Sequence, residues 1–162
     1  MFSKILLPLD GSDLSRAAIA HARELAVATK APIVLLQVID SEEQLISQAS
    51  GITIEPMAMG EVTVDAARAA VASQRAAATQ NLEAARAQLA TAGVQAEVVI
   101  RDGNPGDEIV DSVKELGVDV VVIATHGRTG FRRAILGSVA DHVARNTPNA
   151  AVLLVKPVEE DD

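Results

Sequence analysis

The sequence contains no cysteine, tryptophan or tyrosine, and its only aromatic side chains are Phe2 and Phe131. The lack of cysteine excludes disulfides, thiolate metal sites and cysteine nucleophiles, and it agrees with a reducing cytoplasm. The lack of aromatics excludes the base stacking on which sheet-based RNA-binding modules rely. We therefore expect a cytoplasmic protein that does not recognise RNA.

Basic residues and long apolar stretches are also scarce. Lysine and arginine number 14 against 22 aspartates and glutamates, which gives a net charge of -8. An average field of this sign repels duplex phosphates, so no nucleic-acid partner is expected. No apolar stretch approaches the roughly 20 residues of a membrane span, and the apolar run after Met1 is too short for a signal peptide. We expect no membrane association.

Short apolar runs alternating with helical patterns dominate what is present. Apolar residues make up 49% of the 162 residues, a composition and length typical of one folded domain. Uninterrupted short apolar runs indicate strands buried on both faces, and they occupy residues 4–9, 32–39, 96–100, 119–124 and 150–155. Helical periodicity predicts helices from the Ser12 cap to Thr29 and over 62–92, 105–116 and 138–146.

This alternation predicts a single doubly wound α/β domain over residues 1–157. The expected sheet has five parallel strands in the order 3-2-1-4-5, with four helices distributed over both faces. Residues 40–61 mix serine, glycine, proline and methionine without a sustained period, and we expect them to form a mobile flap. Residues 158–162 form an acidic tail that is expected to be disordered.

Ligands of open α/β sheets bind beyond the carboxyl ends of the strands, where three features stand out. Asp10 follows the first run, and Val38 lies at the end of the second. The glycine-rich segment 127–138 follows the fourth run and leads into a helix at Gly137-Ser138, whose first amides can hold an anion. The alternative for Asp10 is an N-cap or Asx turn, and both interpretations can hold together.

The glycine-rich segment also concentrates positive charge. Gly127 and Gly130 permit close approach of the backbone, and three arginines lie in the same segment: Arg128, Arg132 and Arg133. In an acidic protein this pattern predicts phosphate binding. The alternative is that the glycines only shape a turn and that Ser138 only caps its helix.

The three histidines do not indicate catalysis or a metal site. His126 fits a hydrogen-bonded structural residue or a neighbour of the phosphates better than a general base. His21 and His142 have no carboxylate at metal-ligand spacing that would join them. We therefore predict no metal held by protein side chains and no catalytic residue.

These motifs resemble the universal stress protein family, and the resemblance extends from Lys4 to Lys156. The nucleotide loop of that family is Gly, two residues, Gly, nine residues, Gly and then Ser or Thr. Gly127 and Gly137-Ser138 match this pattern, whereas Ala124 stands in place of the first glycine. Further matching segments are Pro8-Leu9-Asp10-Gly11-Ser12, Leu36-Gln37-Val38-Ile39, Gly103-Asn104-Pro105 and residues 152–157.

The resemblance implies an adenine-nucleotide site for ATP, with AMP or ADP as alternatives, together with Mg²⁺. Asp10 would contact the ribose or base side, and Val38 would meet adenine through its backbone. The remaining implied contacts, most of them around the phosphates, are Pro8, Leu9, Ala124, Gly127, Arg128, Gly137, Ser138 and Val139. The methyl group of Ala124 is expected to weaken or shift the site rather than to abolish it.

The resemblance further implies a regulatory stress-response protein that acts as a homodimer, in which nucleotide shifts conformation or partner binding. The dimer would pair the last strand antiparallel with its twin, through Ala151, Val152, Leu153, Leu154 and Val155. Three alternatives stay open. They are a dimeric stress protein that binds no nucleotide, a slow ATPase, although the loop lacks Gly-Lys-Ser/Thr, and a phosphoacceptor receiver using Asp10, Asp102 and Lys156.

Overall fold

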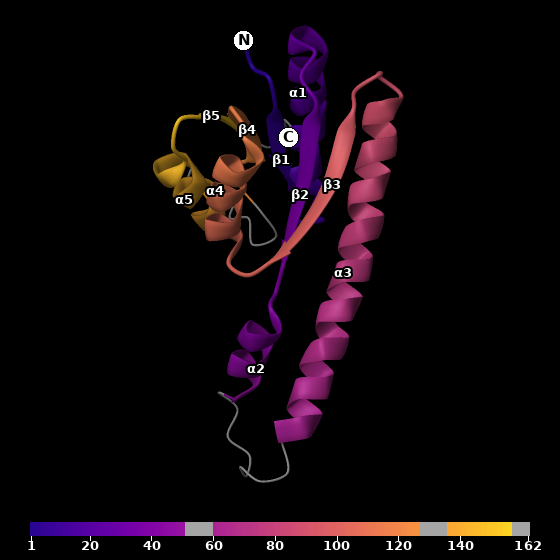
Figure 1. The fold of residues 1–162 in the computed structure, drawn as a ribbon, viewed down its shortest axis with the longest axis vertical. Helices are drawn as coiled ribbons and strands as arrows, with labels where there is room; N and C mark the ends of the chain where they lie inside the picture. The colour runs from indigo at the N-terminus through magenta and orange to yellow at the C-terminus, as the bar shows by residue number, and fades with distance from the viewer. Residues whose placement is uncertain (51–59, 127–135, 157–162) are drawn as a thin grey trace, which may run out of the picture.

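A computed structural model describes residues 1–50, 60–126 and 136–156 of the chain (Figure 1). Its strands are β1 Ile5–Pro8, β2 Ile33–Ile39, β3 Ala96–Asp102, β4 Val120–Ala124 and β5 Ala151–Val155. Its helices are α1 Asp13–Thr29, α2 Glu42–Ser50, α3 Gly60–Ala90, α4 Pro105–Leu116 and α5 Ser138–Asn146. The strands pair in parallel in the order β3-β2-β1-β4-β5, which confirms the predicted class and strand order.

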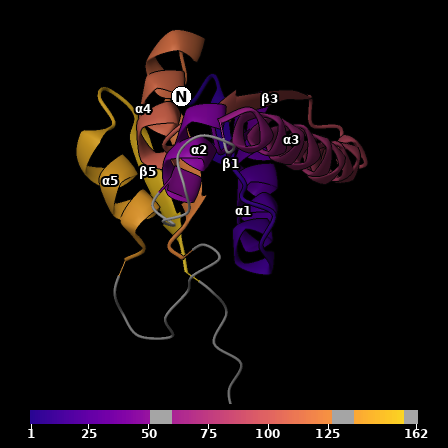
Figure 2. The same ribbon diagram turned by 90° about the horizontal axis from the view of Figure 1, so that it is seen from below.

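Successive side chains of the central strands enter two different cores because they point to opposite faces of the sheet. Ile5 and Leu7 of β1 pack with α1 and α3, whereas Leu6 between them packs with α4 and α5. The view along the sheet shows the same division, with α1 and α3 on one side and α4 and α5 on the other (Figure 2). Burial on both faces explains why these strands read as uninterrupted apolar runs.

The predicted flap contains a helix that the sequence interpretation missed, so the described residues form five helices rather than four. Ser41 precedes α2, and its Oγ atom accepts a hydrogen bond from the Gln44 N–H at 3.2 Å. In return, Oε1 of Gln44 accepts one from the Ser41 N–H at 2.8 Å. This reciprocal pair is a capping box, which satisfies two donors at the start of the helix. Residues 51–59, the rest of the expected flap, lie outside the described part of the chain.

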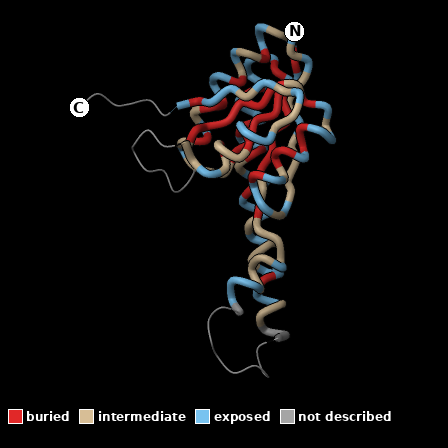
Figure 3. Tube along the Cα trace, turned by 90° about the vertical axis from the view of Figure 1, so that its left-hand side faces the viewer, coloured by how far each residue is buried: buried red, intermediate tan, exposed pale blue. Residues whose placement is uncertain are grey.

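The long helix α3 extends well beyond the sheet, and α2 lies beside its amino-terminal half (Figure 1). The carboxyl-terminal half packs on β2 and β3 through the buried side chains Ala78, Leu82, Ala85 and Leu89. Between residues 63 and 77 the helix buries only Ala67, and the extension is mostly exposed or half-buried (Figure 3). Arg68 Nε lies 3.5 Å from Glu42 Oε1 and links the two helices. No helix within the described ranges is long and apolar enough to cross a bilayer.

Candidate functional site

A cavity of about 540 Å³ lies at the carboxyl ends of β1, β2 and β4 and reaches the first turns of α4 and α5. Its lining includes eight of the ten predicted nucleotide-site residues: Pro8, Leu9, Asp10, Val38, Ala124, Gly137, Ser138 and Val139. The other two, Gly127 and Arg128, lie outside the described residues, as do Gly130, Arg132 and Arg133. The fold therefore brings together residues that the sequence separates by more than a hundred positions.

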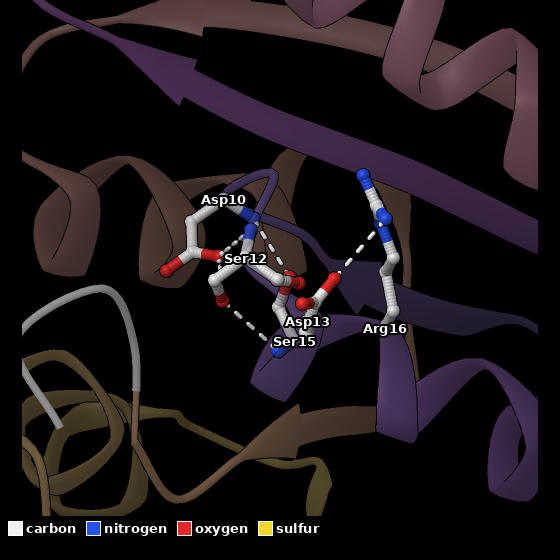
Figure 4. Close-up of polar contacts among 5 residues, drawn as sticks. All are labelled: Asp10, Ser12, Asp13, Ser15 and Arg16. Carbon is white, nitrogen blue, oxygen red and sulfur yellow. Dashed lines mark hydrogen bonds and ion pairs between the residues drawn. The ribbon is translucent and has the colours of Figure 1, made fainter.

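The turn after β1 fixes the orientation of Asp10 (Figure 4). Its Oδ1 atom accepts hydrogen bonds from the Ser12 N–H at 2.9 Å and from the Ser12 hydroxyl at 2.5 Å. Ser12 is the N-cap of α1, because its Oγ atom accepts the Ser15 N–H at 3.1 Å. The Ser15 hydroxyl accepts the Asp10 N–H at 3.3 Å and closes the turn. Asp10 thus forms an Asx turn, the cap itself is Ser12, and the carboxylate is held at the cavity wall.

The backbone of Val38 presents a donor and an acceptor at the cavity. In parallel sheets, alternate residues of a strand direct their N–H and C=O groups to the same neighbouring strand. Leu36 is bonded on the β1 side, where its C=O accepts the Leu9 N–H at 2.8 Å, but β1 ends at Pro8. Val38 is the next residue facing that side, and within the described residues no backbone hydrogen bond from beyond β1 reaches it. Its N–H and C=O groups are therefore available to a ligand.

Close packing between β4 and α5 shapes the opposite part of the cavity. The Gly137 N–H donates to the Thr125 C=O at 2.7 Å. A β-carbon on Gly137 would come within 2.8 Å of that same oxygen, so only glycine fits without displacing the backbone. Gly137 is also the N-cap of α5, and no side chain within the described ranges caps the helix there. The first amides of α5 consequently keep their donor capacity and the positive end of the helix dipole.

The cavity includes polar residues that the sequence interpretation did not assign to the site. Asp40 follows β2 directly, and Gln74 reaches it from α3. Oε1 of Gln74 accepts the Asp40 N–H at 2.9 Å, and Nε2 of Gln74 donates to Oδ2 of Asp40 at 3.0 Å. The position of Asp40 at a strand end was a usable signal. Nothing in the local sequence indicated Gln74, because its place depends on where α3 passes the sheet.

His126 lies at the end of β4 and also lines the cavity. Its Nδ1 atom is 2.9 Å from Oγ1 of Thr125. Its Nε2 atom is buried and has no hydrogen-bond partner among the described residues. Across the described ranges there is no group of three or more histidines and carboxylates that could hold a metal ion.

The predicted dimer strand β5 is an edge of the sheet in the described fold. It pairs with β4 on one side only. Leu153 and Leu154 expose 43% and 37% of their surface, whereas Val155 is buried. An edge that combines unpaired backbone groups with exposed leucines is suited to pairing with another strand.

Comparison with known proteins gives matches along almost the whole chain. The sequence model of the universal stress protein family matches residues 1–156. The universal stress protein YxiE of Bacillus subtilis is 33% identical over 156 residues, which cover 96% of this chain and 100% of the relative. The structure of MJ0577 from Methanocaldococcus jannaschii is 26% identical, covers 99% of both chains and superposes with a TM-score of 0.79.

Two more distant solved structures share the fold. A family protein of Arabidopsis thaliana, crystallised with AMP bound, is 20% identical, covers 98% of this chain and 94% of its own, and has a TM-score of 0.65. The universal stress protein of Archaeoglobus fulgidus in complex with dAMP is 18% identical, covers 96% and 98%, and has the same TM-score of 0.65. From the family match over residues 1–156 and the relative at 33% identity, we conclude that the chain belongs to the universal stress protein family.

Proposed function

We propose that the cavity binds an adenine nucleotide, with ATP as the physiological ligand, and that binding shifts the conformation or partner binding of this stress protein. The observation that carries the proposal is that Asp10, the backbone of Val38 and the first turn of α5 meet at one cavity of about 540 Å³. This volume lies within the range of roughly 300–1,000 Å³ that is usual for small-molecule sites. The family structures with AMP and dAMP support an adenine ligand.

The base and the ribose have complementary partners in the cavity. The Val38 N–H matches the N1 acceptor of adenine, and the Val38 C=O matches its 6-amino group. Leu36, Ile109 and Ile123 supply apolar walls for the rings. The Asp10 carboxylate, held by Ser12, offers acceptors to the ribose hydroxyls.

The phosphates would lie at the start of α5, with the amides of Ser138 and Val139 and the Ser138 hydroxyl as donors. The charged side chains among the described lining residues are the carboxylates of Asp10 and Asp40. Compensating positive charge would therefore come from the α5 dipole, from Arg128 in the adjoining segment and from Mg²⁺. Because the described residues offer no metal-binding cluster, Mg²⁺ would be coordinated mainly by the phosphates.

The proposal includes a homodimer formed by antiparallel pairing of β5 with its counterpart in a second chain. The pairing would satisfy the open edge of the sheet and cover Leu153 and Leu154. It also includes a cytoplasmic location and no nucleic-acid partner, both of which rest on composition and charge.

A slow ATPase is the second candidate function, because the His126 ring lines the cavity together with Gly137 and Ser138 of the proposed phosphate site. The two candidates differ in a simple measurement. A regulatory protein would hold ATP intact, whereas an ATPase would release inorganic phosphate, and the rate would fall in His126→Gln.

Native mass spectrometry of the purified protein with and without Mg-ATP, together with thermal unfolding, tests the binding proposal. We expect a dimer with one nucleotide per chain and a stabilisation that grows with the logarithm of free ligand. The bound nucleotide and the stabilisation by ligand should be lost in the double variant Gly127→Ala, Ser138→Ala. The control Gly93→Ala, Ser47→Ala carries the same chemical changes away from the cavity and should keep both. Absence of an adduct and of any thermal shift at millimolar ATP would establish the alternative, a family member without nucleotide control.

A further inference from the structure

Asp40 and Gln74 form a recognition element that neither the sequence motifs nor the proposed contacts of the nucleotide include. We propose that the Asp40 carboxylate, oriented by Gln74, makes the cavity select a 6-amino purine and reject a 6-oxo purine. This inference rests on the nucleotide site proposed above and specifies which base that site accepts. Asp40 would be the specificity residue, and Gln74 its positioning residue.

The contact between the two side chains fixes the carboxylate at two points. Gln74 accepts the Asp40 N–H through Oε1 at 2.9 Å and donates through Nε2 to Asp40 Oδ2 at 3.0 Å. Both polar atoms of the Gln74 amide are thus used on one residue. Both residues line the cavity and are half-buried, so the carboxylate lies at a site where water competes less with a ligand.

The position of Asp40 relative to Val38 sets which atoms of a base it meets. The chain runs from the Val38 N–H to the Val38 C=O and then onwards to Asp40, two residues or about 7 Å further along. A purine whose N1 accepts the Val38 N–H places its C6 substituent at the Val38 C=O. The side of that substituent that faces away from N1 then points along the chain towards Asp40.

The chemistry at C6 decides between the two classes of purine. A 6-amino group has two hydrogens, so one can bond the Val38 C=O and the other the Asp40 carboxylate, which when ionised is only an acceptor. A 6-oxo group would instead bring an oxygen against two further acceptors. Binding removes water from the Val38 C=O and the Asp40 carboxylate, and a 6-oxo group cannot donate to either of them. The 6-oxo purine therefore binds more weakly, because these acceptors stay unpaired and also repel its oxygen.

Purely structural roles for these residues make a different prediction. If Asp40 and Gln74 serve only to attach β2 to α3, their substitution changes the stability of the fold and weakens the binding of all nucleotides alike. The ratio of ATP to GTP affinity separates the two possibilities, because any general loss of affinity cancels within each variant. The loss of one negative charge from the cavity wall cancels in the same way.

The test measures dissociation constants of Mg-ATP and Mg-GTP by calorimetry for the wild type, Asp40→Asn and Gln74→Ala, with thermal unfolding to verify folding. We expect the wild type to prefer ATP, and Asp40→Asn to reduce that preference roughly tenfold or more, because the asparagine amide can donate to a 6-oxo group. Gln74→Ala should reduce it in the same direction by less. Asp102→Asn is the matched control. Asp102 is the last residue of β3, its Oδ1 atom lies 3.7 Å from Nη2 of Arg75 on α3, and it does not line the cavity.

An unchanged ATP to GTP ratio in Asp40→Asn, in a wild type that binds ATP, would overturn the inference and leave the nucleotide site in place. A wild type that binds neither nucleotide would overturn the proposed function itself. A drop in the ratio that Asp102→Asn reproduces equally would also reject a specific role for Asp40.

Discussion

The Gly137 N–H and the Thr125 C=O are 2.7 Å apart, and a β-carbon on Gly137 would come within 2.8 Å of the same carbonyl oxygen. This contact holds the end of β4 against the start of α5, where the cavity opens. Gly137→Ala should therefore displace the first turn of α5 and destabilise the fold by about 1–3 kcal/mol. It should also lower the affinity for ATP roughly tenfold or more, because the displaced amides lose charge-assisted hydrogen bonds to the phosphates.

The control for this variant is Gly93→Ala. Gly93 has φ +74°, and no atom of the described residues lies near its potential β-carbon, so alanine there is strained but does not clash. It should cost about 1–2 kcal/mol of stability and leave ATP affinity unchanged. Chemical denaturation and calorimetry of both variants would check this. Equal ATP affinity in the two would show that the Gly137–Thr125 contact does not shape the binding site.

Ser12→Ala should couple a loss of stability to a loss of binding. Ser12 caps α1 and also donates to the Asp10 carboxylate at 2.5 Å. Removing the hydroxyl should cost about 1 kcal/mol in the free energy of unfolding and should release one constraint on Asp10. ATP affinity should then fall severalfold in a calorimetric titration.

Asn104→Ala provides the comparison, because Asn104 caps α4 through the Gly106 and Asp107 N–H groups. It should lose a similar amount of stability, yet it does not contact Asp10. If both cap variants lower the affinity for ATP to the same extent, the orientation of Asp10 by Ser12 has no role in binding.

Leu153→Glu should convert the proposed dimer to monomers. The substitution places a charge on the exposed edge strand β5, where antiparallel pairing would have to bury it. Light scattering coupled to size-exclusion chromatography reports the mass directly. Val27→Glu is the control, since Val27 is 56% exposed and belongs to α1 rather than to β5. A Leu153→Glu protein with unchanged mass would reject the β5 interface.

Asp119 anchors the start of the chain and should contribute stability that depends on pH. Its carboxylate accepts the Ser3 N–H and hydroxyl, each at 2.7 Å, and the Lys4 N–H at 3.1 Å. Burial alone raises the pKa of Asp119, but the hydrogen bonds from Ser3 and Lys4 outweigh it and hold that pKa below its ordinary value of 3.8.

Because the pKa is lowered in the folded state, the stabilisation is present above the ordinary value and is lost as pH falls through the lowered one. Asp119→Ala should thus be about 1–3 kcal/mol less stable at pH 7. The difference from the wild type should shrink as the solution is acidified below pH 3.8. Urea unfolding of both proteins across this range measures the difference, and a gap independent of pH would contradict the assignment.

The strands and their order followed from the sequence because strands buried on both faces have a simple signature. α2 was missed although Ser41 and Gln44 have the spacing of a capping box, since neighbouring glycine, serine and proline suggested irregular structure. The residues at strand ends, such as Asp10 and Val38, could be placed because topology alone brings them to one edge. Gln74 could not, because its contact with Asp40 depends on the angle and length of α3.

The extension of α3 beyond the sheet divides one helix into two regimes of hydrogen exchange. Amides near Leu82 and Leu89 are covered by β2 and β3 and should exchange only when the whole sheet opens. Amides between residues 63 and 77 lie on a segment that buries only Ala67, and they should exchange through fraying from the amino-terminal end of the helix. Gln74 lies close to the boundary between these regimes, so a ligand held beside it would move that boundary along the helix and slow the exchange of residues it never touches.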